Sequence, residues 1–124
     1  MMMDTKTVAV AYYTALGKKD MEAVKKCLHP EVQFADPQEK VEGREAVLKA
    51  AKGFTAIFKT LIIRAQFGSE DQAVIVYDVD IPGFAKKLRA ASLLSFQDGL
   101  ISKIELIYDT RCLMEKTEAV SIDG

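Results

Sequence analysis

The sequence lacks the residues and patterns on which most metal-binding, membrane and secreted proteins depend. It has one histidine, His29, and two cysteines, Cys27 and Cys112, whose spacing fits no metal site. No apolar run reaches about 18 residues, so no transmembrane helix is predicted. No apolar stretch follows a basic start at Met1, which argues against a signal peptide. We therefore expect a cytoplasmic protein that needs neither a metal nor an organic cofactor.

An excess of charge of either sign is also absent. The 17 lysines and arginines nearly balance the 18 aspartates and glutamates, for a formal net charge of −1. Nothing in this balance indicates binding to nucleic acid or to an anionic membrane. At 124 residues the chain has the length of one domain, and 49% hydrophobic residues are enough for a core. We expect a single domain over residues 1–124.

The first half of the sequence predicts three helices. Apolar residues at helical spacing indicate a first helix that ends at Gly17. Asp20 is placed to cap a second helix, which Pro30 should stop. A third apolar stripe predicts a helix over residues 44–58.

The remaining sequence predicts five strands. Alternating or β-rich segments cover residues 31–36, 60–67, 72–81, 86–97 and 100–109. Short turn sequences such as Pro82-Gly83 and Asp98-Gly99 join the later strands as hairpins. Hairpins imply an antiparallel sheet with the helices packed on one face, which is an α+β fold.

The last two predicted strands are apolar on both faces. In the final strand Ile104 and Leu106 point one way and Ile107 points the other. One face should line the interior, and no predicted helix remains to cover the other. We therefore expect a homodimer that forms through the outer face of the sheet.

The order and spacing of several motifs resemble the nuclear transport factor 2-like superfamily, in particular its SnoaL-like and ketosteroid isomerase-like members. The resemblance rests on residues 12–16, 28–34, 36–37, 42–46, 96–99 and 104–109. It implies a cystatin-like roll, in which a cone-shaped, strongly curved antiparallel sheet wraps around three helices and leaves a pocket at the open end. Its members include isomerases, cyclases, dehydratases, epoxide hydrolases and non-catalytic domains, so the fold alone does not settle the function.

Asp36 is the first candidate for a catalytic residue. It shares a strand face with Val32 and Phe34, so its carboxylate should point inward. The resemblance places Asp36-Pro37 where the isomerases carry their general base. The alternative is that Asp36 caps the turn before Pro37 or binds a ligand without catalysis.

Tyr12 and Ser92 are the other catalytic candidates. Tyr12 lies on the buried stripe of the first helix, where the resemblance implies the phenol that donates to an enolate oxygen. The alternative is a core tyrosine. Tyr13 points about 100° away and is less expected in the pocket. Where the isomerases have a second donor, a protonated acid, this sequence has Ser92, a weaker donor that disfavours true ketosteroid isomerase activity.

Asp78 and Asp80 share one strand face and form a possible acid pair or part of a cation site. The alternative is a solvated strand end. We expect the rest of the substrate-binding surface to be apolar or aromatic, and assign to it Phe34, Phe54, Phe58, Leu94, Ile104, Leu106 and Tyr108.

Two functions remain open on the sequence. The first is a cofactor-independent acid/base isomerase, or a related enzyme, that acts on a small apolar carbonyl compound. Asp36 would move the proton, and Tyr12, with help from Ser92, would hold the oxygen. The second is a non-catalytic ligand-binding or dimerisation domain of the same fold, which the missing second acid favours.

Overall fold

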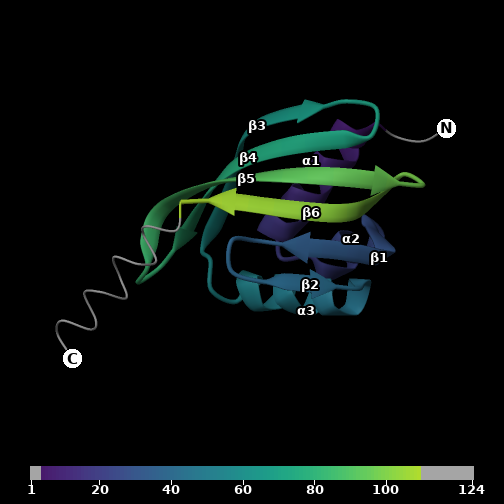
Figure 1. The fold of residues 1–124 in the computed structure, drawn as a ribbon. Coiled ribbons are helices and arrows are strands. Elements are labelled where there is room, and N and C mark those ends of the chain that lie inside the picture. Colours follow the sequence, from purple (N-terminus) through teal and green to yellow (C-terminus); the bar gives the residue numbers. More distant parts are fainter. Residues whose placement is uncertain (1–3, 110–124) are drawn as a thin grey trace.

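The computed structural model describes residues 4–109 of the chain. No helix in this part is long and apolar enough to cross a membrane. Three helices and six strands follow one another along it (Figure 1). In chain order they are α1 (Thr5–Gly17), α2 (Met21–Lys26), β1 (Leu28–Ala35), β2 (Lys40–Glu42), α3 (Arg44–Thr55), β3 (Thr60–Gly68), β4 (Gln72–Ile81), β5 (Ala85–Gln97) and β6 (Leu100–Tyr108).

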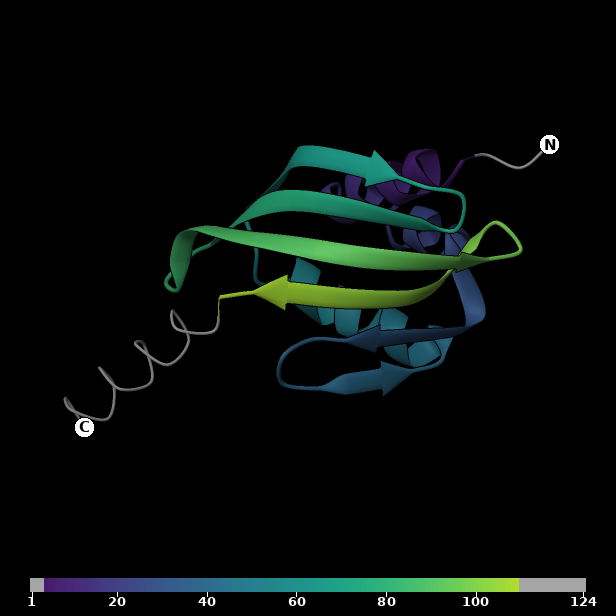
Figure 2. The same ribbon diagram turned by 45° about the horizontal axis from the view of Figure 1, so that its top comes forward.

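The strands form one sheet in the order β2-β1-β6-β5-β4-β3. Hairpins connect β3 to β6 as an antiparallel meander, whereas β1 pairs with β6 in parallel and with β2 antiparallel. The predicted α+β class is confirmed, with one parallel pair in an otherwise antiparallel sheet. The sheet curves less strongly than expected, and the helices cover one of its faces (Figure 2).

The start of β1 is where local sequence signals and tertiary pairing disagree. The second helix ends at Lys26 rather than at Pro30, because the chain from Leu28 onward pairs with β6. The Ile101 N–H already donates to the Cys27 carbonyl over 2.8 Å. Pro30 lies inside β1, where the register with β6 is interrupted between Leu28 and Gln33, so its missing N–H costs no regular ladder bond.

Local capping fixes the other element ends. The Asp4 and Asp20 side chains accept hydrogen bonds from the Thr7 and Ala23 N–H groups and cap α1 and α2. Asp98 and Gly99 both have positive φ, 56° and 77°, as a two-residue hairpin with primed turn geometry requires. The β5–β6 hairpin therefore forms where the sequence predicts it.

The hydrophobic core lies between the helices and the inner face of the sheet. On β4 the inner face carries Ala73, Ile75, Tyr77 and Val79, all buried. The opposite face has no described element over it (Figure 2), and large apolar side chains stand exposed there. The inner face is therefore the one that any internal site must use.

Candidate functional site

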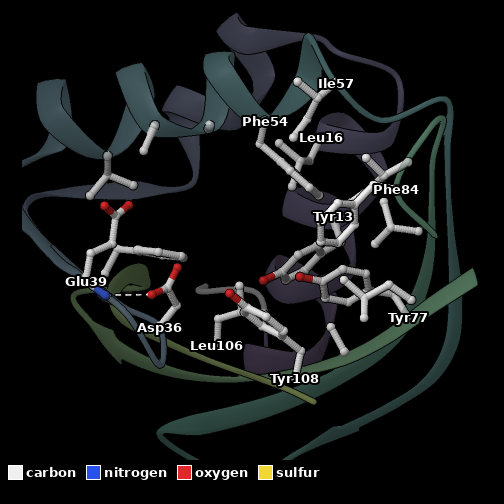
Figure 3. Close-up of a pocket in the computed structure, with 18 of the residues that line it drawn as sticks. Tyr13, Leu16, Asp36, Glu39, Phe54, Ile57, Tyr77, Phe84, Leu106 and Tyr108 are labelled. Atoms are coloured by element: carbon white, nitrogen blue, oxygen red, sulfur yellow. Dashed lines mark hydrogen bonds between the residues drawn. The ribbon is translucent and has the colours of Figure 1, made fainter. Parts of the chain in front are cut away.

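A cavity of about 490 Å³ opens between α1, α3 and the inner face of the sheet. Most of its lining is aliphatic or aromatic, and its aromatic side chains are Tyr12, Tyr13, Phe34, Phe54, Tyr77, Phe84 and Tyr108. A concave apolar site of this size, with a few polar groups converging on it, suits a small organic molecule. Asp36 lies on one side of the cavity and Tyr13 and Tyr77 on the other, and the Tyr108 hydroxyl points into the space between them (Figure 3).

One side of the cavity presents tyrosine hydroxyls. Tyr13 on α1 and Tyr77 on β4 stack with their ring centroids 4.7 Å apart, and both hydroxyls point to the cavity interior (Figure 3). The Tyr13 hydroxyl shares a hydrogen bond with the Ser92 hydroxyl. Burial raises the pKa of Tyr13 well above its ordinary value of 10 and the pKa of Tyr77 to about 12. Both phenols are therefore neutral hydrogen-bond donors at physiological pH.

The other side of the cavity presents Asp36, at the end of β1. Its Oδ1 accepts hydrogen bonds from the Gln38 and Glu39 N–H groups, over 2.7 and 2.8 Å. This is an Asx-type turn, the capping role that the sequence left open. The second carboxylate oxygen turns toward the cavity interior (Figure 3). Asp36 thus combines the two alternatives: one oxygen holds the loop, and the other faces the site.

Glu39 is a cavity residue that the sequence analysis missed. It belongs to the short loop that Asp36 caps, and it lies on the cavity wall next to Asp36 (Figure 3). Its signal in the sequence is the spacing Asp36-x-x-Glu39, because an Asx turn brings the third residue after the aspartate back toward it.

Ser92, which was expected to face the pocket as a second donor beside Tyr12, does not line the cavity. Ser92 contacts Tyr13, not Tyr12, and with 0% exposure it lies behind the cavity wall. Tyr12 also lines the cavity, packed edge to face against Tyr13 with ring centroids 5.0 Å apart. Both tyrosines reach the cavity because the buried stripe of α1 is broad enough to include both. Ser92 therefore orients Tyr13 and does not meet a ligand directly.

The other expected pocket residues divide into two groups. Phe34, Phe54, Leu106 and Tyr108 lie on the cavity wall. Phe58, Leu94 and Ile104 do not line it: all three are buried in the core, and Phe58 stacks on Phe54. The role of the wall residues in binding stays a prediction.

The placement of Asp78 and Asp80 in the pocket is wrong. They share a face with Val74 and Val76, as the alternation indicated, but this is the outer face, because Tyr77 and Val79 point inward. Arg89 makes a bidentate ion pair with Asp78: its Nε and Nη2 donate to the two carboxylate oxygens over 2.7 and 2.9 Å. Arg64 and Lys87 approach the same carboxylate at 3.6 and 3.7 Å.

The ion pairs of Asp78 with Arg89, Arg64 and Lys87 predict how the stability of the fold changes in acid. Hydrogen bonds from Arg89 hold the pKa of Asp78 below its ordinary value of 3.8. A lowered pKa stabilises the fold above the unfolded-state pKa, and this contribution is lost as pH falls through the folded-state pKa. We expect Asp78→Asn to lower the melting temperature at pH 7, and the difference from wild type to shrink below about pH 4.

Circular dichroism melts from pH 3 to pH 7 measure this difference. Asp71→Asn, in the exposed β3–β4 loop, is the matched control and should change the melting temperature little at either end. If the melting temperatures of Asp78→Asn and wild type differ by the same amount at pH 3 and at pH 7, the lowered pKa of Asp78 is not the source of the stabilisation.

Comparison with known proteins identifies the fold class first. Solved structures that resemble the chain include a protein from Kribbella flavida (21% identity, 98% of each chain covered, TM-score 0.86) and a nuclear transport factor 2-like protein of unknown function from Cytophaga hutchinsonii (23% identity, 92% and 97% covered, TM-score 0.79). Another, from Kribbella flavida, is provisionally described as a ketosteroid isomerase (20% identity, 85% and 77% covered, TM-score 0.74). The fold is therefore of the nuclear transport factor 2-like, cystatin-like type.

The family follows from the sequence itself. Residues 9–104 match the family model of the SnoaL-like domain, and the chain belongs to this family. A search of curated proteins gave no match. Among residues 4–109 there is no group of three or more histidine, cysteine or acidic side chains arranged to hold a metal ion.

Proposed function

We propose that this chain binds a small apolar carbonyl compound and moves a proton at the carbon next to the carbonyl. The observation that carries the proposal is the facing of one carboxylate oxygen of Asp36 and the hydroxyls of Tyr13 and Tyr77 across one apolar cavity (Figure 3). An acid/base group and a neutral donor on opposite sides of a bound molecule are what enolisation requires.

The reaction would run through an enolate. The free oxygen of Asp36 takes the proton from the carbon next to the carbonyl, and the electron pair of that C–H bond moves into the carbonyl. Tyr13 or Tyr77 donates a hydrogen bond to the oxygen that gains negative charge. The proton on Asp36 exchanges with solvent, and a proton then returns to the same carbon or, in an unsaturated ketone, to a carbon further along the conjugated system, which gives an isomer; either step restores the carboxylate.

Hydrogen exchange tests this proposal directly. Small cyclic ketones and unsaturated ketones are incubated with the protein in D₂O, and loss of the α-proton signal is followed by NMR. We expect exchange well above the buffer rate. Binding without exchange for every ketone would reject the catalytic part of the proposal and leave the binding part standing.

A non-catalytic binding domain is the second candidate. Two observations favour it: Oδ1 of Asp36 is committed to the loop, and Ser92 stands where the isomerase resemblance implies a second acid. In this case the same cavity would hold the compound without exchanging its protons.

We further propose that two copies associate through the outer face of the sheet. Ile62, Phe67 and Ile107 are 53%, 63% and 62% exposed on this face. A dimer interface on this face would remove these side chains from water. We expect a dimer in light scattering at micromolar concentration. Ile107→Lys should shift it toward monomer, and Glu22→Lys on the exposed side of α2 should not. A monomeric wild type would contradict this proposal.

A further inference from the structure

The residue that follows the end of α1 adopts a backbone conformation that glycine normally takes. The helix closes with two hydrogen bonds, from the Lys19 N–H to the Leu16 carbonyl and from the Asp20 N–H to the Ala15 carbonyl, both over 3.0 Å. This pattern places Lys19 in the left-handed region, with a φ of 61°. A lysine there carries a cost in free energy that glycine would avoid, so we looked for a role of its side chain that offsets this cost.

The Lys19 side chain makes two contacts with one residue of the connection between α3 and β3. Its Nζ donates a hydrogen bond to the Phe58 carbonyl over 2.8 Å. The same ammonium group lies over the Phe58 ring, 4.7 Å from the ring centroid, which is within the range of a cation–π contact. Lys19 and Phe58 are 39 residues apart in the chain, so these contacts tie the end of α1 to the α3–β3 connection.

The α3–β3 connection forms one end of the cavity. Ile57 lines the cavity and is 56% exposed, so it stands where the cavity meets solvent. Phe58 is buried and stacks on Phe54, another lining residue, with ring centroids 4.8 Å apart. Ile57 and Phe54 lie across the cavity from Asp36 (Figure 3). A group that holds Phe58 in place therefore also sets the positions of two wall residues.

A second contact fixes the same connection to the sheet. The Lys59 N–H donates to the Asp80 carbonyl over 2.7 Å, directly before the Thr60–Asp80 pair that begins the β3–β4 ladder. This contact joins two backbone groups, whereas the contact with α1 depends on one exposed side chain, that of Lys19. Loss of the Lys19 contacts would leave the connection attached to the sheet and would free the part that carries Ile57.

We propose that Lys19 is a positioning residue for the cavity: it holds the α3–β3 connection against the end of α1 and thereby slows the release of a bound molecule. This rests on the proposed function only in requiring that the cavity bind a small apolar molecule. Lys19 does not line the cavity, so it acts through Phe58 and Ile57 and not by touching the ligand. Without its contacts the end wall moves away from the bound molecule more often, and the molecule leaves faster.

Stopped-flow fluorescence with prodan, an apolar ketone whose emission depends on the polarity around it, measures this release. Lys19→Met keeps a stem of the same length but has no charge and no N–H donor, and should release prodan at least about fivefold faster than wild type. Lys19→Arg keeps a cation and its donors and should stay within about twofold of the wild-type rate. Lys18→Met, at the exposed neighbouring residue, is the matched control and should also stay within about twofold.

Lys19→Gly separates the role of the side chain from the strain in the backbone. Glycine adopts a φ of 61° without strain, so this variant should melt at or above the melting temperature of Lys19→Met and still release prodan as fast as Lys19→Met does. If Lys19→Gly releases prodan at the wild-type rate, or if Lys19→Arg releases it as fast as Lys19→Met, the contacts with Phe58 do not control release and the inference is overturned.

The outcomes separate this inference from the proposed function. If Lys19→Met and wild type release prodan at the same rate, the positioning role is wrong and the cavity remains a binding site. If wild type does not bind prodan, the binding part of the proposed function fails and this inference fails with it. Hydrogen–deuterium exchange without ligand checks the contact itself: the Ile57 and Phe58 amides, which donate to the Phe54 carbonyl, should exchange faster in Lys19→Met. Unchanged exchange at these amides would show that Lys19 does not hold the connection.

Discussion

Asp36→Asn should reduce α-proton exchange by at least about 100-fold while leaving the fold almost unchanged. The amide keeps an oxygen where Oδ1 accepts from the Gln38 and Glu39 N–H groups, so the loop retains its cap. The amide NH₂ group then replaces the carboxylate oxygen that faces the cavity, and this group cannot accept a proton. Base catalysis is therefore lost without loss of the loop.

The melting temperature of Asp36→Asn shows whether the Asp36 carboxylate stabilises or destabilises the fold. A buried carboxylate without partners would destabilise the fold, and its replacement by Asn would raise the melting temperature. Oδ1 of Asp36 instead accepts two N–H hydrogen bonds, which would be weaker with the amide oxygen of Asn. We therefore expect Asp36→Asn to lower the melting temperature slightly, and Asp36→Ala, which removes both hydrogen bonds, to cost about 1–2 kcal/mol.

Glu39→Gln completes the comparison. Glu39 lies on the same wall and is the other carboxylate that could accept a proton there. If Asp36→Asn retains wild-type exchange and Glu39→Gln abolishes it, the base is Glu39 and the assignment to Asp36 is wrong. If both variants exchange at the wild-type rate, the reaction does not use this cavity wall.

The sequence predicted those parts of the fold that local chemistry determines. Asp20 caps α2, and the Asp98-Gly99 turn joins β5 to β6, because in each case the signal and the structure involve residues adjacent in the chain. The start of β1 was missed because the pairing partner of Leu28, Ile101, is far away in the sequence. The helix-stopping property of Pro30 gave no information about that partner.

The site was predicted less completely, for two physical reasons. Alternation along β4 shows that Asp78 and Asp80 share a face, but both faces of this strand carry apolar residues, so the sequence does not say which face is inner. On α1 the buried stripe includes both Tyr12 and Tyr13, and only the position of Ser92 on β5 decides which hydroxyl it meets. Such choices depend on how elements pack, not on any one element.

The second large effect is expected at the Tyr13–Ser92 hydrogen bond. Ser92 is fully buried on β5, and its hydroxyl shares a hydrogen bond with the phenol that faces the cavity. Ser92→Ala removes one partner and leaves the phenol less well satisfied in the core, at a cost of about 1–3 kcal/mol in the free energy of unfolding. Ser95→Ala, on the same strand but bonded to exposed Gln72, is the control and should cost less than about 1 kcal/mol.

A double-mutant cycle separates the pair from its surroundings. Tyr13→Phe removes the other hydroxyl, and the double variant removes both. If the two groups stabilise each other, the double variant should be less destabilised than the sum of the single variants, by about 1 kcal/mol in urea denaturation. The exchange assay gives a second comparison. Tyr13→Phe should lower the rate of α-proton exchange about 100-fold, because the substitution removes a donor to the enolate oxygen. Ser92→Ala should lower the rate less, because Ser92 only orients that donor. Equal losses in exchange for Ser92→Ala and Tyr13→Phe would place Ser92 in contact with the substrate. Strict additivity in the cycle would show that Ser92 does not orient Tyr13.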